Sequence, residues 1–151
     1  MPCGKHQLEL DIPIEYTWNF VSDMNNWAPL VPGYVKHEII SCNQSTWEFK
    51  GEVGKIKKSV CLQIDITEWK KPSTVSFNLT GLNENFDGNG YFQAEKINDK
   101  LTAMTGFLNI TARGFTGPMI NSVLRTIVPK TTRELTAAVA TKMGEVETVM
   151  H

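Results

Sequence analysis

Apolar and polar residues alternate along most of the chain between positions 34 and 112, and this pattern predicts β-strands. A period of two places successive side chains on opposite faces of a sheet. Six segments show it, at 34–41, 46–53, 55–69, 74–82, 90–97 and 101–112. Turns that contain Gly, Asn, Asp or Pro separate the segments. The pattern therefore predicts a series of antiparallel hairpins.

Before these strands, the spacing of apolar residues predicts one more strand and two short helices. Leu8 and Leu10 alternate with acidic residues in a segment that ends at Pro13. Proline suits the first position of a helix, and apolar residues follow it at helical spacing, at Ile14, Trp18 and Val21. A second helical turn is expected near Asp23. Its apolar residues Trp27 and Leu30 should close one end of the molecule.

The last part of the sequence, 117–150, has the periodicity of a long amphipathic helix. Its apolar stripe consists of Ile120, Val123, Leu124, Ile127, Val128, Leu135, Ala138, Val139, Met143 and Val146. Pro129 cannot donate a hydrogen bond to the carbonyl of Arg125, so we expect a kink of more than roughly 20° that divides the helix into two segments. An antiparallel sheet with one long helix to cover it must curl around that helix.

The predicted fold class is therefore α+β, with the order β-α-α-β6-α and a curved seven-stranded antiparallel sheet wrapped around the C-terminal helix. We expect a single domain over residues 1–151. Strand and helix phase together predict an apolar inner surface around a cavity. Its lining is expected to be Trp47, Phe49, Leu62, Ile64, Phe77, Leu79, Phe92, Met104, Leu108, Ile110, Ile120, Leu124 and Ile127.

Three glycines share the inner phase of their strands, and they influence the expected size of the cavity. Gly51, Gly90 and Gly106 should bend the sheet and leave volume unfilled. An empty apolar void of about 300 Å³ would cost up to about 7 kcal/mol. Net stability of a domain is only about 5 to 15 kcal/mol. This comparison favours a hydrophobic guest in the cavity.

Composition excludes several classes of function. The 151 residues carry a formal net charge of −1, so there is no overall field to attract nucleic acid. Cys3, Cys42 and Cys61 are odd in number and far apart, which argues against a disulfide framework and favours the cytoplasm. We expect no signal peptide at the N-terminus and no transmembrane segment.

The sequence lacks the common catalytic and metal-binding motifs. No His, Cys or carboxylate pair has metal-ligand spacing, and no phosphate-binding loop or nucleophile elbow is present. The sequence Gly88-Asn89-Gly90 is interpreted as a bend. Two polar anchors for a ligand remain: His37, which strand alternation places with inner-face residues, and Arg113 at the cavity mouth. The expectation is no metal, no cofactor and no catalytic residue.

The order of elements resembles the helix-grip fold of the START-like (SRPBCC) superfamily over nearly the whole chain. Within it, the positions of several Pro, Trp, Asp and Gly residues are similar to those of the CoxG family, which is associated with carbon monoxide dehydrogenase. These are Pro13, Trp18, Asp23, Pro32-Gly33, Gly88-Asn89-Gly90, Gly106, Gly114 and Gly117. The superfamily resemblance implies a deep hydrophobic cavity for lipids, sterols, polyketides, quinones or hormones. The CoxG resemblance implies an oxidoreductase partner and membrane recruitment.

Longer CoxG members carry a C-terminal extension implicated in membrane attachment, whereas this sequence stops at His151. We therefore expect transient membrane contact without stable insertion. The leading hypothesis is a non-catalytic protein that carries a small hydrophobic ligand, such as a lipid or quinone. Two alternatives stay open: a polyketide cyclase or dehydratase-like enzyme that uses the same cavity, and an adaptor that binds a partner protein.

Overall fold

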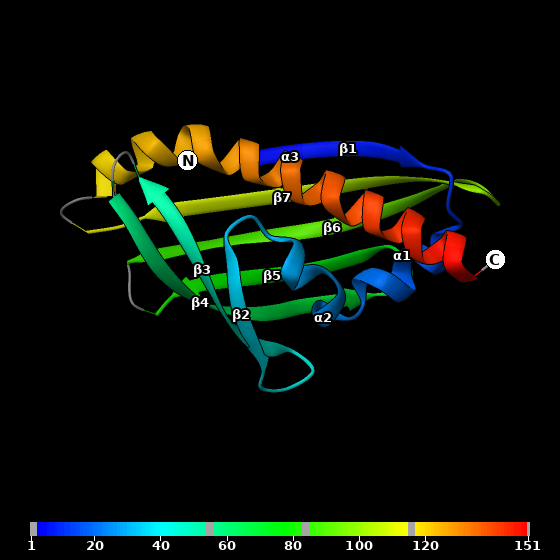
Figure 1. Cartoon of the computed structure of the whole chain (residues 1–151), viewed down its shortest axis with the longest axis horizontal. Coiled ribbons are helices and arrows are strands. Elements are labelled where there is room, and N and C mark those ends of the chain that lie inside the picture. The colour runs from blue at the N-terminus through cyan, green and yellow to red at the C-terminus, as the bar shows by residue number, and fades with distance from the viewer. Residues whose placement is uncertain (1–2, 54–55, 83–84, 115–116, 151) are drawn as a thin grey trace.

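The computed structural model describes residues 3–53, 56–82, 85–114 and 117–150, without the side chains of 51–53, 56–58 and 144–150. Its elements follow the predicted order (Figure 1). They are β1 (Cys3–Leu10), α1 (Ile14–Val21), α2 (Met24–Trp27), the 3-10 helix η1 (Ala28–Leu30), β2 (Tyr34–Ile39), β3 (Gln44–Val53), β4 (Ile56–Lys70), β5 (Thr74–Gly81), β6 (Phe86–Asn98), β7 (Leu101–Ala112) and α3 (Gly117–Met150).

The seven strands form one antiparallel sheet in the order β1-β7-β6-β5-β4-β3-β2. Every strand from β2 to β7 pairs with its neighbour in sequence, and the first strand pairs with the last. Helix α3 crosses the sheet and packs chiefly against β1 and β7 (Figure 1). The predicted α+β helix-grip architecture is confirmed.

Local side-chain chemistry explains the two short helices. Pro13 is the N-cap residue of α1, where its missing N–H removes a donor that would have no partner within the helix. The Asp23 side chain accepts a hydrogen bond from the Asn25 backbone N–H at 3.0 Å and starts α2. Both helices therefore begin where the sequence predicted, and they place Trp18 and Trp27 inside the molecule.

Gly88-Asn89-Gly90 is not a bend, and this interpretation was wrong. The three residues lie inside β6 and pair with β5 on one side and β7 on the other. A Cβ atom at Gly88 would collide with the Asn109 backbone carbonyl, so glycine lets the neighbouring strand approach closely. Asp87 belongs to the same strand and pairs with Thr111.

The expected division of the last helix at Pro129 was also wrong. Helix α3 runs as one element from Gly117 to Met150 with Pro129 inside it. Tertiary packing holds this stretch in place, because a Cβ at Gly4 of β1 would lie only 2.6 Å from the Pro129 Cα. Close contact with a strand therefore overrides the local preference of proline to interrupt a helix.

Threonines, not only apolar residues, form the most buried line of α3. Thr132 and Thr136 are 3 % and 1 % exposed, and they continue the line of Val128. Each hydroxyl donates to the carbonyl four residues earlier, at 2.8 Å and 2.7 Å, so neither is left without a partner. Their small size lets the helix lie close to the sheet.

The inward glycines do not leave empty space, which corrects the sequence-based expectation. A Cβ at Gly106 would collide with the Thr136 Oγ1, and one at Gly90 would lie 2.6 Å from the Phe77 ring. Neighbouring side chains thus already fill the volume at both positions. Gly51 and Val146 lie outside the described side chains.

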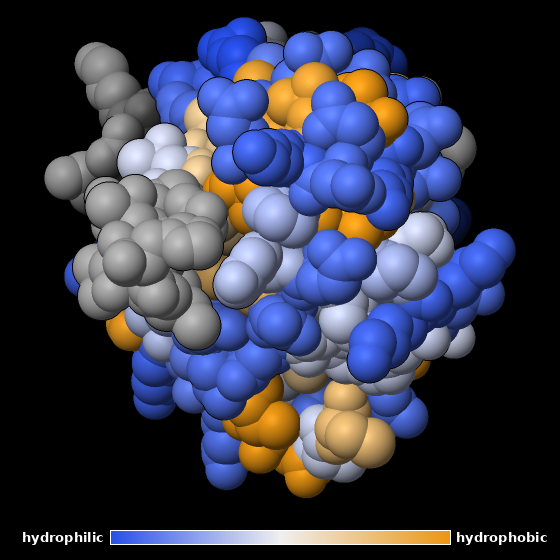
Figure 2. All heavy atoms as spheres, turned by 90° about the vertical axis from the view of Figure 1, so that its right-hand side faces the viewer, coloured by the Kyte–Doolittle hydropathy of each residue, from blue (hydrophilic) through white to orange (hydrophobic). Residues whose placement is uncertain are grey.

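Trp27 fills the interior at the end of the molecule where α1 and α2 lie. Its indole is 1 % exposed, and its Nε1–H donates to the Val21 carbonyl at 3.0 Å. The ring packs at centroid distances of 5.2 Å against Trp47, 6.1 Å against Phe77 and 5.1 Å against Phe92. Trp27 is thus buried among aromatic rings, and the closure of one end by Trp27 and Leu30 stays a prediction. Figure 2 faces this end, and hydrophilic residues dominate its surface, with hydrophobic residues in a few separate patches.

Candidate functional site

The opposite end of the interior is less tightly covered, and we treat it as the candidate ligand site. Seven apolar residues on the inner side of the strands or on the first part of α3 are only partly buried there. We call them the half-buried cluster: Phe49, Val60, Leu108, Ile110, Ile120, Leu124 and Ile127. The four strand residues pack against the core. The apolar interior therefore continues to this end, where these side chains of the described residues remain partly exposed.

Strand register brings the strand members of the half-buried cluster together. Phe49 on β3 pairs with Val60 on β4, next to the buried pair of Trp47 and Leu62. Leu108 on β7 pairs with Gly90 on β6, whose missing side chain makes room for the Phe77 ring. On β3 and β4, exposure of the inner face thus increases from the pair of Trp47 and Leu62 to the pair of Phe49 and Val60.

Helix α3 contributes a second apolar face to this site. Ile120, Leu124 and Ile127 are spaced four and three residues apart, so they share one side of the helix. At 3.6 residues per turn, that side lies about 130° from the line of Thr132 and Thr136 that packs on the sheet. One side of α3 is thus fully used in packing, and its neighbouring apolar side remains partly exposed.

The predicted lining residues fall into two groups. Trp47, Phe77 and Phe92 contact Trp27, which occupies the space that they surround. Four further residues are buried in the same core: Leu62, Ile64, Leu79 and Met104. The remaining six predicted residues all belong to the half-buried cluster. Sequence alternation identified the inner face correctly but could not show which part of it Trp27 fills.

His37 uses both of its ring nitrogens in hydrogen bonds. Its Nδ1 lies 2.6 Å from the Tyr34 hydroxyl, and its Nε2 lies 2.6 Å from the Asn25 Oδ1. Its ring also lies beside Trp47, with a centroid distance of 6.5 Å. In this arrangement the imidazole connects β2 to α2, and a ligand would have to displace one of these partners to reach it.

Arg113 follows β7 at the end of the molecule where the half-buried cluster lies. Its Nε donates to the Asp87 Oδ2, and the two side chains are 59 % and 43 % exposed. This hydrogen bond, together with the charge attraction, raises the pKa of Arg113. A raised pKa keeps the guanidinium charged to still higher pH, so this group adds no change of stability near neutral pH. Its remaining N–H groups are available to a ligand.

No group of three or more His, Cys, Asp and Glu side chains in the described ranges could hold a metal ion. No helix in the same ranges is long and apolar enough to cross a membrane. Cys3, Cys42 and Cys61 are present as thiols.

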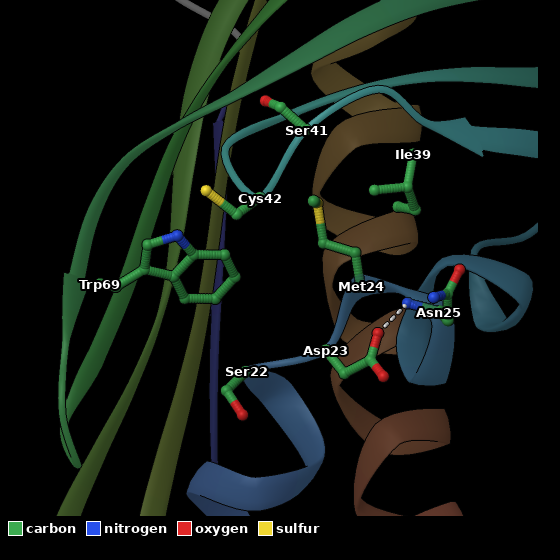
Figure 3. A pocket seen from close by; sticks show the side chains of 8 residues that line it. All are labelled: Ser22, Asp23, Met24, Asn25, Ile39, Ser41, Cys42 and Trp69. Atoms are coloured by element: carbon green, nitrogen blue, oxygen red, sulfur yellow. Dashed lines mark hydrogen bonds between the residues drawn. The ribbon is translucent and has the colours of Figure 1, made fainter.

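A ligand-sized pocket that the sequence did not predict lies on the outside of the molecule. Its volume is about 370 Å³, and the α1–α2 junction, the β2–β3 hairpin and the end of β4 enclose it (Figure 3). Trp69 forms one wall, although its place in the alternation of β4 gave no sign of this. A register shift between Ile66 and Glu68 changes the alternation there, and only the folded sheet reveals it.

Comparisons with known proteins agree with this architecture. A family model with the bare description "-like" matches residues 1–145. No curated protein sequence matches the chain. The chain is similar in structure to a conserved protein from Geobacillus kaustophilus, with a TM-score of 0.74, 16 % identity and 95 % of each chain covered.

Two other solved structures carry more informative names. A START superfamily protein from Mycobacterium smegmatis has a TM-score of 0.71 at 14 % identity, covering 95 % of this chain and 98 % of that one. The Zhui aromatase/cyclase from Streptomyces sp. R1128 has a TM-score of 0.67 at 14 % identity, covering 99 % of this chain and 95 % of that one. At these identities the similarity concerns the fold.

Proposed function

Because the chain belongs to the family whose model spans it and has the START-like helix-grip fold, we propose that it binds a small hydrophobic ligand without transforming it. The proposed site is the half-buried cluster between the sheet and the first part of α3. Three elements would line the site: β3 with Phe49, β7 with Leu108 and α3 with Leu124. Trp27 forms its floor.

The observation that carries this proposal is the partial burial of seven apolar residues that lie together on the inner side of the sheet and on the first part of α3. A water-soluble domain gains about 0.8 kcal/mol for each methylene group that it removes from water. Leaving seven large apolar side chains half-covered therefore forgoes stability that tighter packing would provide. A guest molecule that covers them recovers this stabilisation, and a protein that carries such a guest has a reason to keep them.

The shape of the site favours an elongated molecule with an apolar tail and a polar head. The tail would lie along the half-buried cluster toward Trp27. The head would lie near Arg113, whose guanidinium suits a carboxylate or phenolate. A lipid or a quinone has this form. The resemblance to CoxG adds the proposal that the protein serves an oxidoreductase and touches membranes transiently. The three free cysteines add the proposal that it acts in the cytoplasm.

A non-catalytic role is preferred over a cyclase or dehydratase because of His37. A general base needs a ring nitrogen that can reach the substrate, and both nitrogens of this histidine already have partners in the fold. The fold shared with an aromatase/cyclase does not transfer its activity. Steady conversion of a polyketide substrate by the purified protein would overturn this preference.

Native mass spectrometry of the freshly purified protein, followed by titration with a fluorescent fatty acid, tests the binding function. We expect either a co-purified apolar mass or saturable binding of the probe. Leu124→Gln should weaken probe binding about tenfold, because it places an amide where apolar contact is required.

Met119→Gln is the matched control on the same helix, since Met119 is 69 % exposed and lies outside the half-buried cluster. It should bind the probe like the parent protein. The proposal would be abandoned if no mass co-purifies and no probe binds. It would also fail if the control weakens binding as much as Leu124→Gln does.

A further inference from the structure

The pocket on the outside of the molecule has mixed chemistry that the interior site lacks. It is lined by Ser22, Asp23, Met24, Asn25, Ile39, Ser41, Cys42 and Trp69. Figure 3 shows Trp69 on one side, coming from β4, and Asp23 on the other, at the junction of α1 and α2. None of the half-buried cluster lines it. This pocket is therefore a separate place for a ligand, with a volume of about 370 Å³ that is within the usual range of small-molecule sites.

Trp69 is held in position by its neighbours. The register shift between Ile66 and Glu68 brings it opposite Val75, a fully buried residue of β5. Its ring packs edge-on against Trp18 at a centroid distance of 6.4 Å. Its Nε1–H donates to the Asn43 Oδ1 at 2.8 Å. The indole is thus fixed before any ligand arrives and still remains partly exposed.

Among the described residues that line the pocket, the only charged side chain is acidic. Asp23 supplies a carboxylate, and no lysine or arginine lines the pocket. The Asp23 Oδ1 accepts the Asn25 backbone N–H, which leaves Oδ2 for another donor. Within the described ranges Asp23 forms no salt bridge. Asp23 is exposed, and a carboxylate opposite an aromatic ring attracts a positive charge.

We propose that this pocket binds a small organic cation, with its ammonium group between Asp23 and the Trp69 ring. The apolar part of the cation would lie against Met24 and Ile39, which supply the remaining apolar wall. Trp69 contributes through attraction between the cation and the π-face, and Asp23 contributes through direct charge attraction. A neutral molecule of the same shape would gain neither interaction.

Choline and its uncharged carbon analogue, 3,3-dimethylbutan-1-ol, separate charge from shape. Each is titrated into the ¹⁵N-labelled full-length protein, and the indole N–H signals are followed by NMR. We expect choline to move the Trp69 indole signal in a saturable manner and to bind at least about fivefold more tightly than the alcohol. Equal binding of the two probes, or no saturable shift with choline, would overturn the proposal.

Two variants and one control locate the effect. Asp23→Asn keeps a side chain that caps α2 equally well but removes the charge, and it should weaken choline binding about fivefold. Trp69→Leu should weaken it by a similar factor. Asp99→Asn removes the same charge from a distant exposed ion pair with Lys96 and should change nothing.

A normal choline affinity for Asp23→Asn would refute the role of the carboxylate. If Trp69→Leu does not fold, the comparison of choline with the alcohol on the parent protein still decides the question. The choline comparison and the pocket variants do not depend on the interior site. Leu124→Gln, which alters the half-buried cluster, should leave choline binding unchanged.

Discussion

Glycine at position 106 sets the distance between the sheet and α3. A Cβ there would collide with the Thr136 Oγ1, and the hydrogen bond from that hydroxyl to the Thr132 carbonyl limits how far it can turn away. We expect Gly106→Ala to lower the free energy of unfolding by about 1 to 3 kcal/mol, the usual cost of overpacking. Urea denaturation of the parent and the variant measures it.

A second substitution tells a local collision from a general effect on β7. Thr136→Ala removes the hydroxyl that the new methyl group would meet. The double variant Gly106→Ala with Thr136→Ala should therefore be more stable than the sum of the two single effects predicts. Strict additivity would show that Gly106 is needed for some other reason than its distance from α3.

Helix α3 is the element in which local preference and tertiary packing conflict most clearly. It continues through Pro129, although proline inside a helix typically costs about 3 kcal/mol. We expect Pro129→Ala to raise the free energy of unfolding by about 1 to 3 kcal/mol, because the lost hydrogen bond to the Arg125 carbonyl returns. Thermal and urea unfolding should both report the gain.

Pro118→Ala is the matched control for this change, since Pro118 lies in the first turn, where the missing N–H has no partner in any case. It should alter stability little. A less stable Pro129→Ala protein would mean that the pyrrolidine ring packs against β1 in a way that alanine cannot replace.

Hydrophobic periodicity in the sequence predicted the helices and strands reliably. The sequence was a poor guide to features that depend on contacts with neighbouring elements. Alternation located the strands and their order, and Pro13 and Asp23 marked the starts of the short helices. The buried role of Thr132 was missed because its hydroxyl finds a partner within its own helix. The glycine-rich segment of β6 resembles a turn in composition, and only the approach of β7 explains why it is extended.

For the candidate site, the sequence predicted which residues lie on the inner face of the sheet. It did not predict which of them belong to the buried core and which to the half-buried cluster. Phe49 and Phe77 have the same inner phase, yet the first is half-buried and the second packs against Trp27. That difference depends on where the α2 segment lies above the sheet. Trp69 was missed for a related reason, because a register shift is set by pairing between strands and leaves no mark in the alternation.

At the scale of the whole molecule, the two ends of the interior should differ in how easily they open. Hydrogen exchange followed by mass spectrometry should find slower exchange in peptides that contain Trp27 and Val75 than in peptides that contain Phe49 and Leu108. A bound fatty acid should slow exchange mainly in the second set. Equal protection of both ends by the ligand would contradict a site confined to the half-buried cluster.

Trp27 also limits the route by which a long ligand would enter and leave the proposed site. In the proposed binding mode, Trp27 occupies the interior beyond the half-buried cluster, so a tailed molecule would enter and leave the site at the same end. The polar head of the ligand would remain near Arg113 throughout, where an acceptor protein or membrane would contact it first. Handover would then begin at the polar group, and the last atoms released would be the terminal carbons of the tail.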